Sequence, residues 1–251
     1  MTGPALAHAE SGPDGAPLVA LVHGSMDRMA GFAKVTRRLE RDHRVLRYDR
    51  RGYAQSLDVG PPFTMAQHVD DLLALLDGRR ALVVGHSLGG NIALAAAQRA
   101  PDIVRALVVY EAPLSWEPWW PGNATRVAAA VGDPADIAEG FMRRMIGDAL
   151  WERLPAATRE ARRAEGPALI GELRDVRAAR PWDPDCITVP VVVGQGETSS
   201  DHHRRAAAWL ADALACPLVT VPGAGHGAHS SHPDALTALV AQAEALAADG
   251  S

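Results

Sequence analysis

A single serine lies between two glycines in the pentapeptide Gly85-His86-Ser87-Leu88-Gly89. The five residues follow an apolar run and precede an alanine-rich segment, which is the strand–turn–helix context that a nucleophilic serine needs. Small residues two positions away leave room for a strained turn, and the turn projects the Ser87 hydroxyl from the edge of a sheet. The N-terminus of the following helix favours negative charge that develops nearby. The motif therefore predicts Ser87 as a nucleophile and the N–H of Leu88 as one donor to an oxyanion.

A serine nucleophile needs a base that accepts its proton. Three histidines near the end of the chain are candidates, namely His226, His229 and His232. Their three-residue spacing also raises the question of a metal site. No carboxylate or cysteine is grouped with them in the sequence, so we expect no metal and no cofactor.

The base in turn needs a carboxylate that fixes its tautomer and stabilises the imidazolium. The stretch VVYEAPLSW, residues 108 to 116, ends an apolar run with Glu111. A carboxylate at the end of a buried strand is poorly solvated unless an imidazole or an arginine pairs with it. Glu111 is therefore a candidate partner for a histidine, or else for a downstream arginine such as Arg126 or Arg143.

Short apolar, β-branched runs alternate with longer segments of helical periodicity along most of the chain. We predict strands at Leu18–His23, Arg44–Tyr48, Ala81–Gly85, Val104–Tyr110, Val189–Val193 and Leu218–Val221. We predict helices between and after them at Thr64–Asp77, Leu88–Arg99, His203–Leu214 and Pro233–Ala248. Several strands are apolar at nearly every position, as strands covered on both faces are. The alternation predicts an α/β fold in which a mainly parallel sheet is flanked by helices.

The alternation stops between about Leu114 and Asp185, where only helical patterns occur. They cover Ala135–Ile146, Ala156–Ala164 and Pro167–Arg177. We interpret residues 114–185 as a helical lid, inserted after the strand that ends near Tyr110, and residues 1–113 and 186–251 as the core domain. The lid contains five of the six tryptophans. We expect an apolar, partly aromatic wall for the substrate, and the candidate substrate-binding residues are His86, Trp116, Trp119, Trp120, Met142 and Met145.

Three segments together resemble the α/β-hydrolase family. They are the His23-Gly24 pair after the first predicted strand, the Tyr48–Gly52 segment after the second, and the Ser87 turn after the third. Ala54 departs from the family pattern, which commonly has a glycine there, and we interpret this segment as loop architecture. The resemblance spans nearly the whole chain, although the lid matches only in its position and helical character.

The resemblance implies roles for particular residues. The second oxyanion N–H is expected to belong to the residue after the His-Gly pair, which is Ser25, with Met26 as a further contributor. The family commonly carries its catalytic histidine in a G-x-G-H segment after the last strand. In this chain that segment is Gly223–His226, so His226 is the expected base.

The position of the acid differs between branches of the family. Many members carry an aspartate in the loop after the fifth predicted strand, but that position is Ser199 here, which holds no negative charge at neutral pH. Asp201 lies two residues later, and Glu197 is nearer the strand but out of register. Other branches place the acid at the end of the preceding strand, which is the position of Glu111. We favour Glu111 and keep Asp201 as the alternative acid, and a site with another acceptor or none is the third option.

Composition narrows the class of protein. The chain has 251 residues, of which 47% are hydrophobic, and carries a net charge of −5 without a basic cluster. This argues against a nucleic-acid partner. There is no signal-peptide pattern and no apolar run long enough to insert into a membrane. We expect a cytoplasmic monomer or small homo-oligomer that acts on a small, hydrophobic molecule.

These observations predict a serine hydrolase that cleaves a carboxylic ester, lactone or thioester through an acyl-serine. The same fold and the same residues also support cofactor-free lyases and C–C bond hydrolases. A third possibility of a different class is a ligand-binding protein without turnover on a hydrolase fold.

Overall fold

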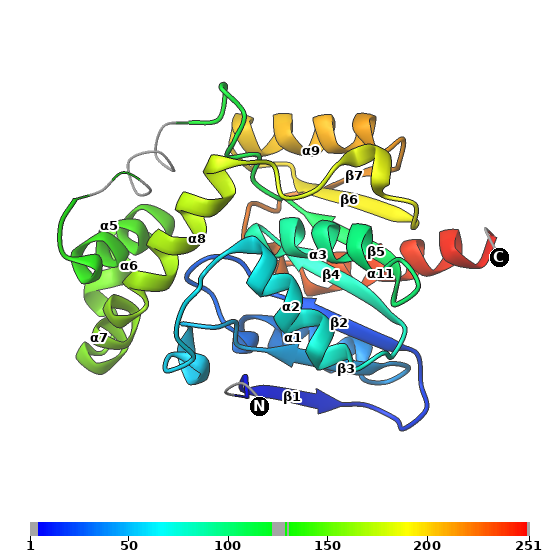
Figure 1. Cartoon of the computed structure of the whole chain (residues 1–251), viewed down its shortest axis with the longest axis horizontal. Helices are drawn as coiled ribbons and strands as arrows, with labels where there is room; N and C mark the ends of the chain where they lie inside the picture. The colour runs from blue at the N-terminus through cyan, green and yellow to red at the C-terminus, as the bar shows by residue number, and fades with distance from the viewer. Residues whose placement is uncertain (1–4, 122–128, 130, 250–251) are drawn as a thin grey trace.

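The sheet is parallel almost throughout, as the alternation of strands and helices predicts (Figure 1). The computed structural model describes residues 5–121, 129 and 131–249. Within them seven strands form one sheet in the order β1-β3-β2-β4-β5-β6-β7, and only β1 is antiparallel to its neighbour. Their bounds are β1 His8–Ser11, β2 Leu18–Val22, β3 Arg44–Tyr48, β4 Ala81–His86, β5 Val104–Tyr110, β6 Val191–Gly196 and β7 Leu218–Val221.

The register of the central strands brings their carboxyl ends to one edge of the sheet. Val22 of β2 pairs with Gly85 of β4, His86 of β4 pairs with Tyr110 of β5, and Tyr110 pairs with Gly194 of β6. The residues that follow these strands are therefore neighbours in space although they are far apart in the chain. In open α/β sheets this edge is where ligands bind.

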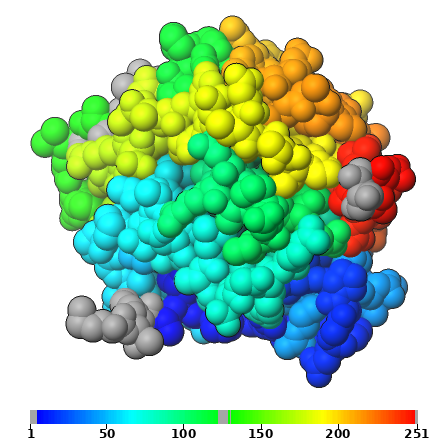
Figure 2. All heavy atoms as spheres, turned by 45° about the vertical axis from the view of Figure 1, so that its right-hand side comes forward, coloured from blue at the N-terminus to red at the C-terminus, as the bar shows by residue number. Residues whose placement is uncertain are grey.

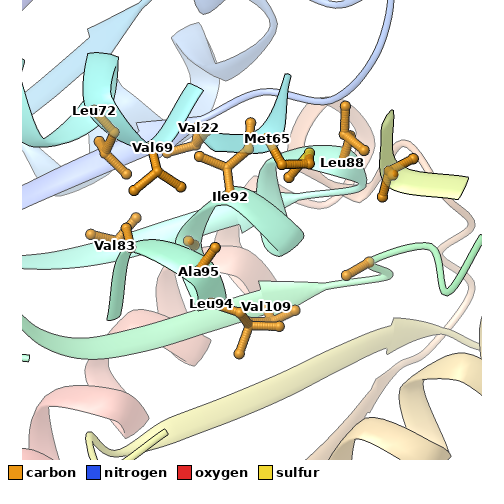
Figure 3. Packing of buried hydrophobic residues seen from close by; sticks show 14 of the residues in the cluster. Val22, Met65, Val69, Leu72, Val83, Leu88, Ile92, Leu94, Ala95 and Val109 are labelled. Atoms are coloured by element: carbon orange, nitrogen blue, oxygen red, sulfur yellow. The ribbon is translucent and has the colours of Figure 1, made fainter. Parts of the chain in front are cut away.

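Helices cover both faces of the sheet because alternate residues of each buried strand point to opposite faces. Besides the insertion described below, the helices are α1 Ala33–Leu39, α2 Met65–Leu76, α3 Leu88–Arg99, α9 Asp201–Ala213, α10 Ala228–Ser231 and α11 Pro233–Asp249. One apolar cluster packs α2, α3 and α9 on one face, and the other packs α1 and α11 on the opposite face. In Figure 3, Val69 of α2 and Ile92 of α3 approach Val22 and Val83 of the strands.

In the described part of residues 114–185, four α-helices and no strand lie between β5 and β6. They are α5 Pro134–Ile146, α6 Asp148–Arg153, α7 Ala156–Ala164 and α8 Gly166–Ala178. The insertion contacts the loops at the carboxyl edge, since the Met65 N–H donates to the Asp175 carboxylate at 2.7 Å and Arg162 donates to the Met26 carbonyl at 2.8 Å. In Figure 2 the yellow-green atoms of the insertion lie against the cyan atoms of the segment after β3. That it acts as a lid stays a prediction.

The fold class is confirmed, and the differences from the predicted elements are local. Strand β6 begins after Pro190 and extends to Gly196, three residues beyond the predicted end, because its last residues pair with β7. Strand β1 and helices α1, α6 and α10 were not predicted. The β1 sequence, HAES, has no apolar alternation, and this strand is an edge strand held by pairing with β3.

A buried ion pair joins the core to the insertion. Arg50, after β3, donates from Nη1 to Glu172 Oε2 of α8 at 2.7 Å, and both side chains are completely buried. Tyr53 donates to the other Glu172 oxygen at 2.6 Å. Burial opposes ionisation of Glu172, but Arg50 and the hydrogen bonds outweigh it and lower the pKa of Glu172 to about 2. Arg50 Nε and Nη2 donate to the carbonyls of His23 and Gly24, at 3.0 Å each, and Nη1 also lies 3.2 Å from His68 Nε2.

The substitution Glu172→Gln leaves the buried Arg50 charge without its partner, so it should lower the free energy of unfolding by about 3–5 kcal/mol. Denaturant unfolding at neutral pH measures this change. Because the pKa of Glu172 is lower in the folded protein, its contribution is present above the unfolded pKa of about 4.3 and is lost as the pH falls towards about 2.

The matched control is Asp70→Asn, which removes an ion pair to Arg99 whose side chains are 45% and 54% exposed. That change should cost less than about 1 kcal/mol. Equal losses in the two variants would contradict a structural role for the buried pair.

Candidate active site

Ser87 occupies a strained turn between β4 and α3, as the motif predicts. Its φ of 54° and ψ of −127° lie outside the regions that a serine ordinarily adopts. The turn requires a close approach at Gly89, where an added Cβ would lie 2.2 Å from the Val22 carbonyl oxygen. The Ser87 N–H donates to the Tyr110 carbonyl at 2.9 Å, so the serine lies beside the end of β5. Strain of this kind is typical of functional positions.

The loop after β2 passes directly over Ser87. A Cβ added at Gly24 would lie 2.7 Å from the Ser87 Cβ, so only glycine allows this approach. In the described residues the N–H groups of Ser25 and Met26 donate no hydrogen bond, and Met26 has a φ of 56°. Leu88 is the first residue of α3, where an N–H has no partner within the helix. The three predicted oxyanion donors thus lie on the two segments that meet at Ser87.

His23 holds this loop in place and is not a proton donor or acceptor for the site. Its Nδ1–H donates to the Gly24 carbonyl at 2.8 Å, and its Nε2 accepts from the Arg50 N–H at 2.9 Å. Burial and the adjacent Arg50 charge lower the pKa of His23 to about 3, so the ring stays neutral. His23 therefore braces the loop after β2.

Glu111 and His226 are in direct contact. The His226 Nδ1–H donates to Glu111 Oε2 at 2.7 Å. Glu111 is fully buried, whereas the His226 side chain is 19% exposed. His86, the residue before Ser87, donates from Nε2 to the His226 carbonyl at 2.7 Å, which places His226 beside the serine turn. No hydrogen bond from Ser87 Oγ to His226 occurs in the described residues, and such bonds often form only when substrate is bound.

The second oxygen of Glu111 has its own donors. Oε1 accepts from the Gly196 N–H at 2.7 Å and from the Ser199 hydroxyl. Burial raises the pKa of Glu111, but the hydrogen bonds from His226, Ser199 and Gly196 outweigh burial and hold the pKa below the ordinary glutamate value. Ser199, at the position where the resemblance leads one to expect an aspartate, therefore donates to Glu111. Sequence reasoning identified that position but not the donor role of Ser199 or Gly196.

The other carboxylates lie elsewhere. Asp201 is 96% exposed and pairs with Arg204, and Glu197 accepts from the Gly223 N–H at 2.8 Å. Arg143, an alternative partner for Glu111, pairs instead with carboxylates of the insertion. The other such arginine, Arg126, lies outside the described residues.

Two further histidines contact His226, and their position was not predicted. The His203 ring stacks on the His226 ring with a centroid distance of 4.4 Å and an angle of 22°. Burial and the adjacent His226 lower the pKa of His203 to about 3, so it is neutral. The sequence predicted only that a helix begins at this residue. His86 is 95% buried and packs between His226 and His229, and it braces His226 instead of lining a substrate wall.

The predicted substrate-binding residues of the insertion differ in their burial and in their contacts with the site. Trp120 is buried and contacts the His203 ring edge-on at 5.4 Å, which connects it to the site. Trp119 adjoins Trp120, and Trp116 packs edge-on against Trp182. Met142 is buried in α5, whereas Met145 is 49% exposed.

Comparisons with known proteins identify the family of this chain. Residues 19–239 match the family model described as "Alpha/beta hydrolase family". The chain belongs to the alpha/beta hydrolase family. None of its helices in the described residues combines the length and the apolar character that crossing a membrane requires.

Solved structures of related proteins cover nearly all of this hydrolase chain. A hydrolase from Pseudomonas aeruginosa superposes with a TM-score of 0.76 and 28% identity, over 94% of this chain and 92% of that one. The enol-lactonase from Burkholderia xenovorans gives a TM-score of 0.74 and 25% identity, over 94% and 95%. Family membership and these structures support hydrolase activity in general.

The curated relatives match over a shorter range. "Putative carbamate hydrolase RutD" from Enterobacter cloacae is 36% identical over 99 residues, which is 38% of this chain and 37% of the relative. The chain spans only 26 to 41% of the length of such relatives.

The substitution Ser199→Ala should raise the pKa of Glu111, because it removes one of the donors that stabilise the ionised carboxylate. Because the pKa of Glu111 is lowered in the folded protein, ionised Glu111 stabilises the fold, and this stabilisation is lost as the pH falls through the folded-state pKa. In the variant this loss begins at higher pH. Carbon-13 NMR titration of the glutamate carboxyl groups measures the shift.

Thr198→Val is the matched control, because the Thr198 hydroxyl donates to the Ala224 carbonyl and not to Glu111. An unchanged Glu111 pKa in Ser199→Ala would show that the serine does not support the carboxylate.

Proposed function

We propose that this chain is a serine hydrolase that cleaves a carboxylic ester, lactone or thioester of small to medium size with a hydrophobic part. The observation that carries the proposal is the 2.7 Å hydrogen bond from His226 Nδ1 to the buried Glu111 carboxylate. A carboxylate on Nδ1 leaves Nε2 as the proton acceptor and stabilises the imidazolium once it forms. The strained turn at Ser87 supplies the nucleophile.

The proposed reaction has two steps. Ser87 Oγ attacks the acyl carbon while His226 Nε2 takes the serine proton, and the N–H groups of Ser25 and Leu88, with Met26 contributing, hold the oxyanion. His226 then gives the proton to the departing alkoxide or thiolate, which leaves an acyl-serine. In the second step water attacks this acyl group, His226 accepts a proton from the water, and the acid product is released with Ser87 reprotonated.

The proposed substrate class rests on the side chains next to the site. Trp120 and the neutral His203 ring form an aromatic surface beside His226, and Trp119 adjoins Trp120. Trp116 and Met142 stay candidates for the same surface. Such a surface favours an apolar acyl or alcohol group. The enol-lactonase among the structural neighbours favours including lactones. The RutD relative favours testing carbamates as further acyl substrates.

A fluorophosphonate probe should add one adduct to the folded protein, on Ser87, because an activated serine attacks phosphorus as it attacks an acyl carbon. Intact-mass spectrometry and peptide mapping locate the adduct. The variants Ser87→Ala and Ser25→Ala separate the nucleophile from a neighbouring hydroxyl, and only the first should abolish labelling. Folded wild-type protein that stays unlabelled would refute the serine mechanism.

The substitution Glu111→Gln should lower kcat for a p-nitrophenyl ester by about 10³–10⁴-fold, since the amide no longer stabilises the imidazolium. Asp201→Asn is the matched control and should retain activity within a few fold, because its side chain is exposed. The reverse pattern would transfer the role of the acid to Asp201.

A further inference from the structure

Behind His226, three potential metal ligands from three separate segments face one another. Asp27 follows the oxyanion loop, His86 ends β4, and His229 lies in α10. One donor atom of each lies within 4.8 Å of those of the other two. The sequence placed no carboxylate near His229, because Asp27 approaches it only through the fold. His86 and His229 are 5% and 7% exposed.

The Nδ1 atom of His86 is unprotonated, as a nitrogen that binds a metal must be. Its Nε2 donates to the His226 carbonyl at 2.7 Å, and since a carbonyl can only accept, Nε2 carries the proton. Nδ1 is therefore a bare lone pair, and it is buried without a hydrogen-bond partner among the described residues. A histidine ligand characteristically donates its other N–H to a backbone carbonyl in this way.

The Asp27 carboxylate is oriented in a similar manner. Oδ1 accepts from the Arg28 N–H at 2.8 Å, which fixes the carboxylate and directs Oδ2 to the cluster. Oδ2 pairs with His229 Nε2 at 3.2 Å, so these two potential ligand atoms already face each other. The Asp27–His229 pair and the His86 Nδ1 atom, which has no hydrogen-bond partner among the described residues, thus lie together in one cluster.

We propose that Asp27, His86 and His229 form a binding site for a divalent transition-metal ion of the zinc class. Imidazole nitrogen and carboxylate oxygen suit such an ion, and water completes the coordination. Bonds of about 2.0–2.1 Å in a tetrahedral site place the ligand atoms about 3.4 Å apart. Since no two of the three ligand atoms are more than 4.8 Å apart, binding an ion requires any pair to approach by roughly 1.4 Å at most. A bound ion would link three segments: the loop that contains Met26, the residue before Ser87, and helix α10. The site does not depend on the proposed hydrolase function.

Zinc titration of EDTA-treated protein, followed by thermal unfolding, tests the site. Wild-type protein should show a saturable rise in Tm of about 5–10 °C at a free Zn²⁺ concentration 100 times the Kd. Asp27→Asn and His229→Gln should each lose most of this rise. His232→Gln is the matched control from the same region and should keep it.

A second set of donors, Glu111, His203 and His226, provides the competing explanation. His203→Gln removes that set and should leave the zinc effect unchanged. The proposal is overturned if wild type shows no saturable rise, or if the rise survives Asp27→Asn and is lost in His203→Gln. Should the Asp27 and His229 variants not fold, anomalous scattering from zinc-soaked wild-type crystals decides. A peak between Asp27, His86 and His229 supports the site, and a peak elsewhere or none overturns it.

Discussion

The charge of Glu111 is buried completely, and its stability depends on donors that no single segment of the chain supplies. Gly196 ends β6, Ser199 follows it, and His226 lies in the loop after β7, yet all three donate to this one carboxylate. An unpaired carboxylate at this depth would be strongly disfavoured, so the parallel register of β5, β6 and β7 and the geometry of the site depend on each other. The positive φ of Glu111, 49°, is part of the turn that directs the side chain to these donors.

A second buried charge organises the other side of the site. Arg50 places its guanidinium between Glu172 of α8 and the loop after β2, which it contacts through the carbonyls of His23 and Gly24. The loop beside Ser87 and one helix of the insertion therefore share a single ion pair. Arg162 adds a further link, from α7 to the Met26 carbonyl. Moving α8 away from the core would separate the buried Arg50 and Glu172 charges, which costs free energy.

Local sequence patterns were sufficient to predict the fold and part of the candidate site. Apolar β-branched runs predicted six of the seven strands in the described residues, and the glycine-serine turn predicted the conformation of Ser87. The serine at position 199 made Glu111 the preferred partner of His226. What could not be predicted depends on long-range packing: the edge strand β1, the hydroxyl of Ser199 donating to Glu111, the ring of His203 on His226, and the approach of Asp27 to His229. No spacing in the chain encodes those contacts.

The central claim is that Glu111 holds His226 through Nδ1. Nitrogen-15 and proton NMR of histidine-labelled protein tests it without substrate. The His226 ring should carry its proton on Nδ1 in the resting protein and show a low-field resonance for it, as expected for a hydrogen bond to a buried carboxylate. That resonance should disappear in Glu111→Gln and persist in Asp201→Asn. A His226 Nδ1–H signal that is unchanged in Glu111→Gln would contradict the account.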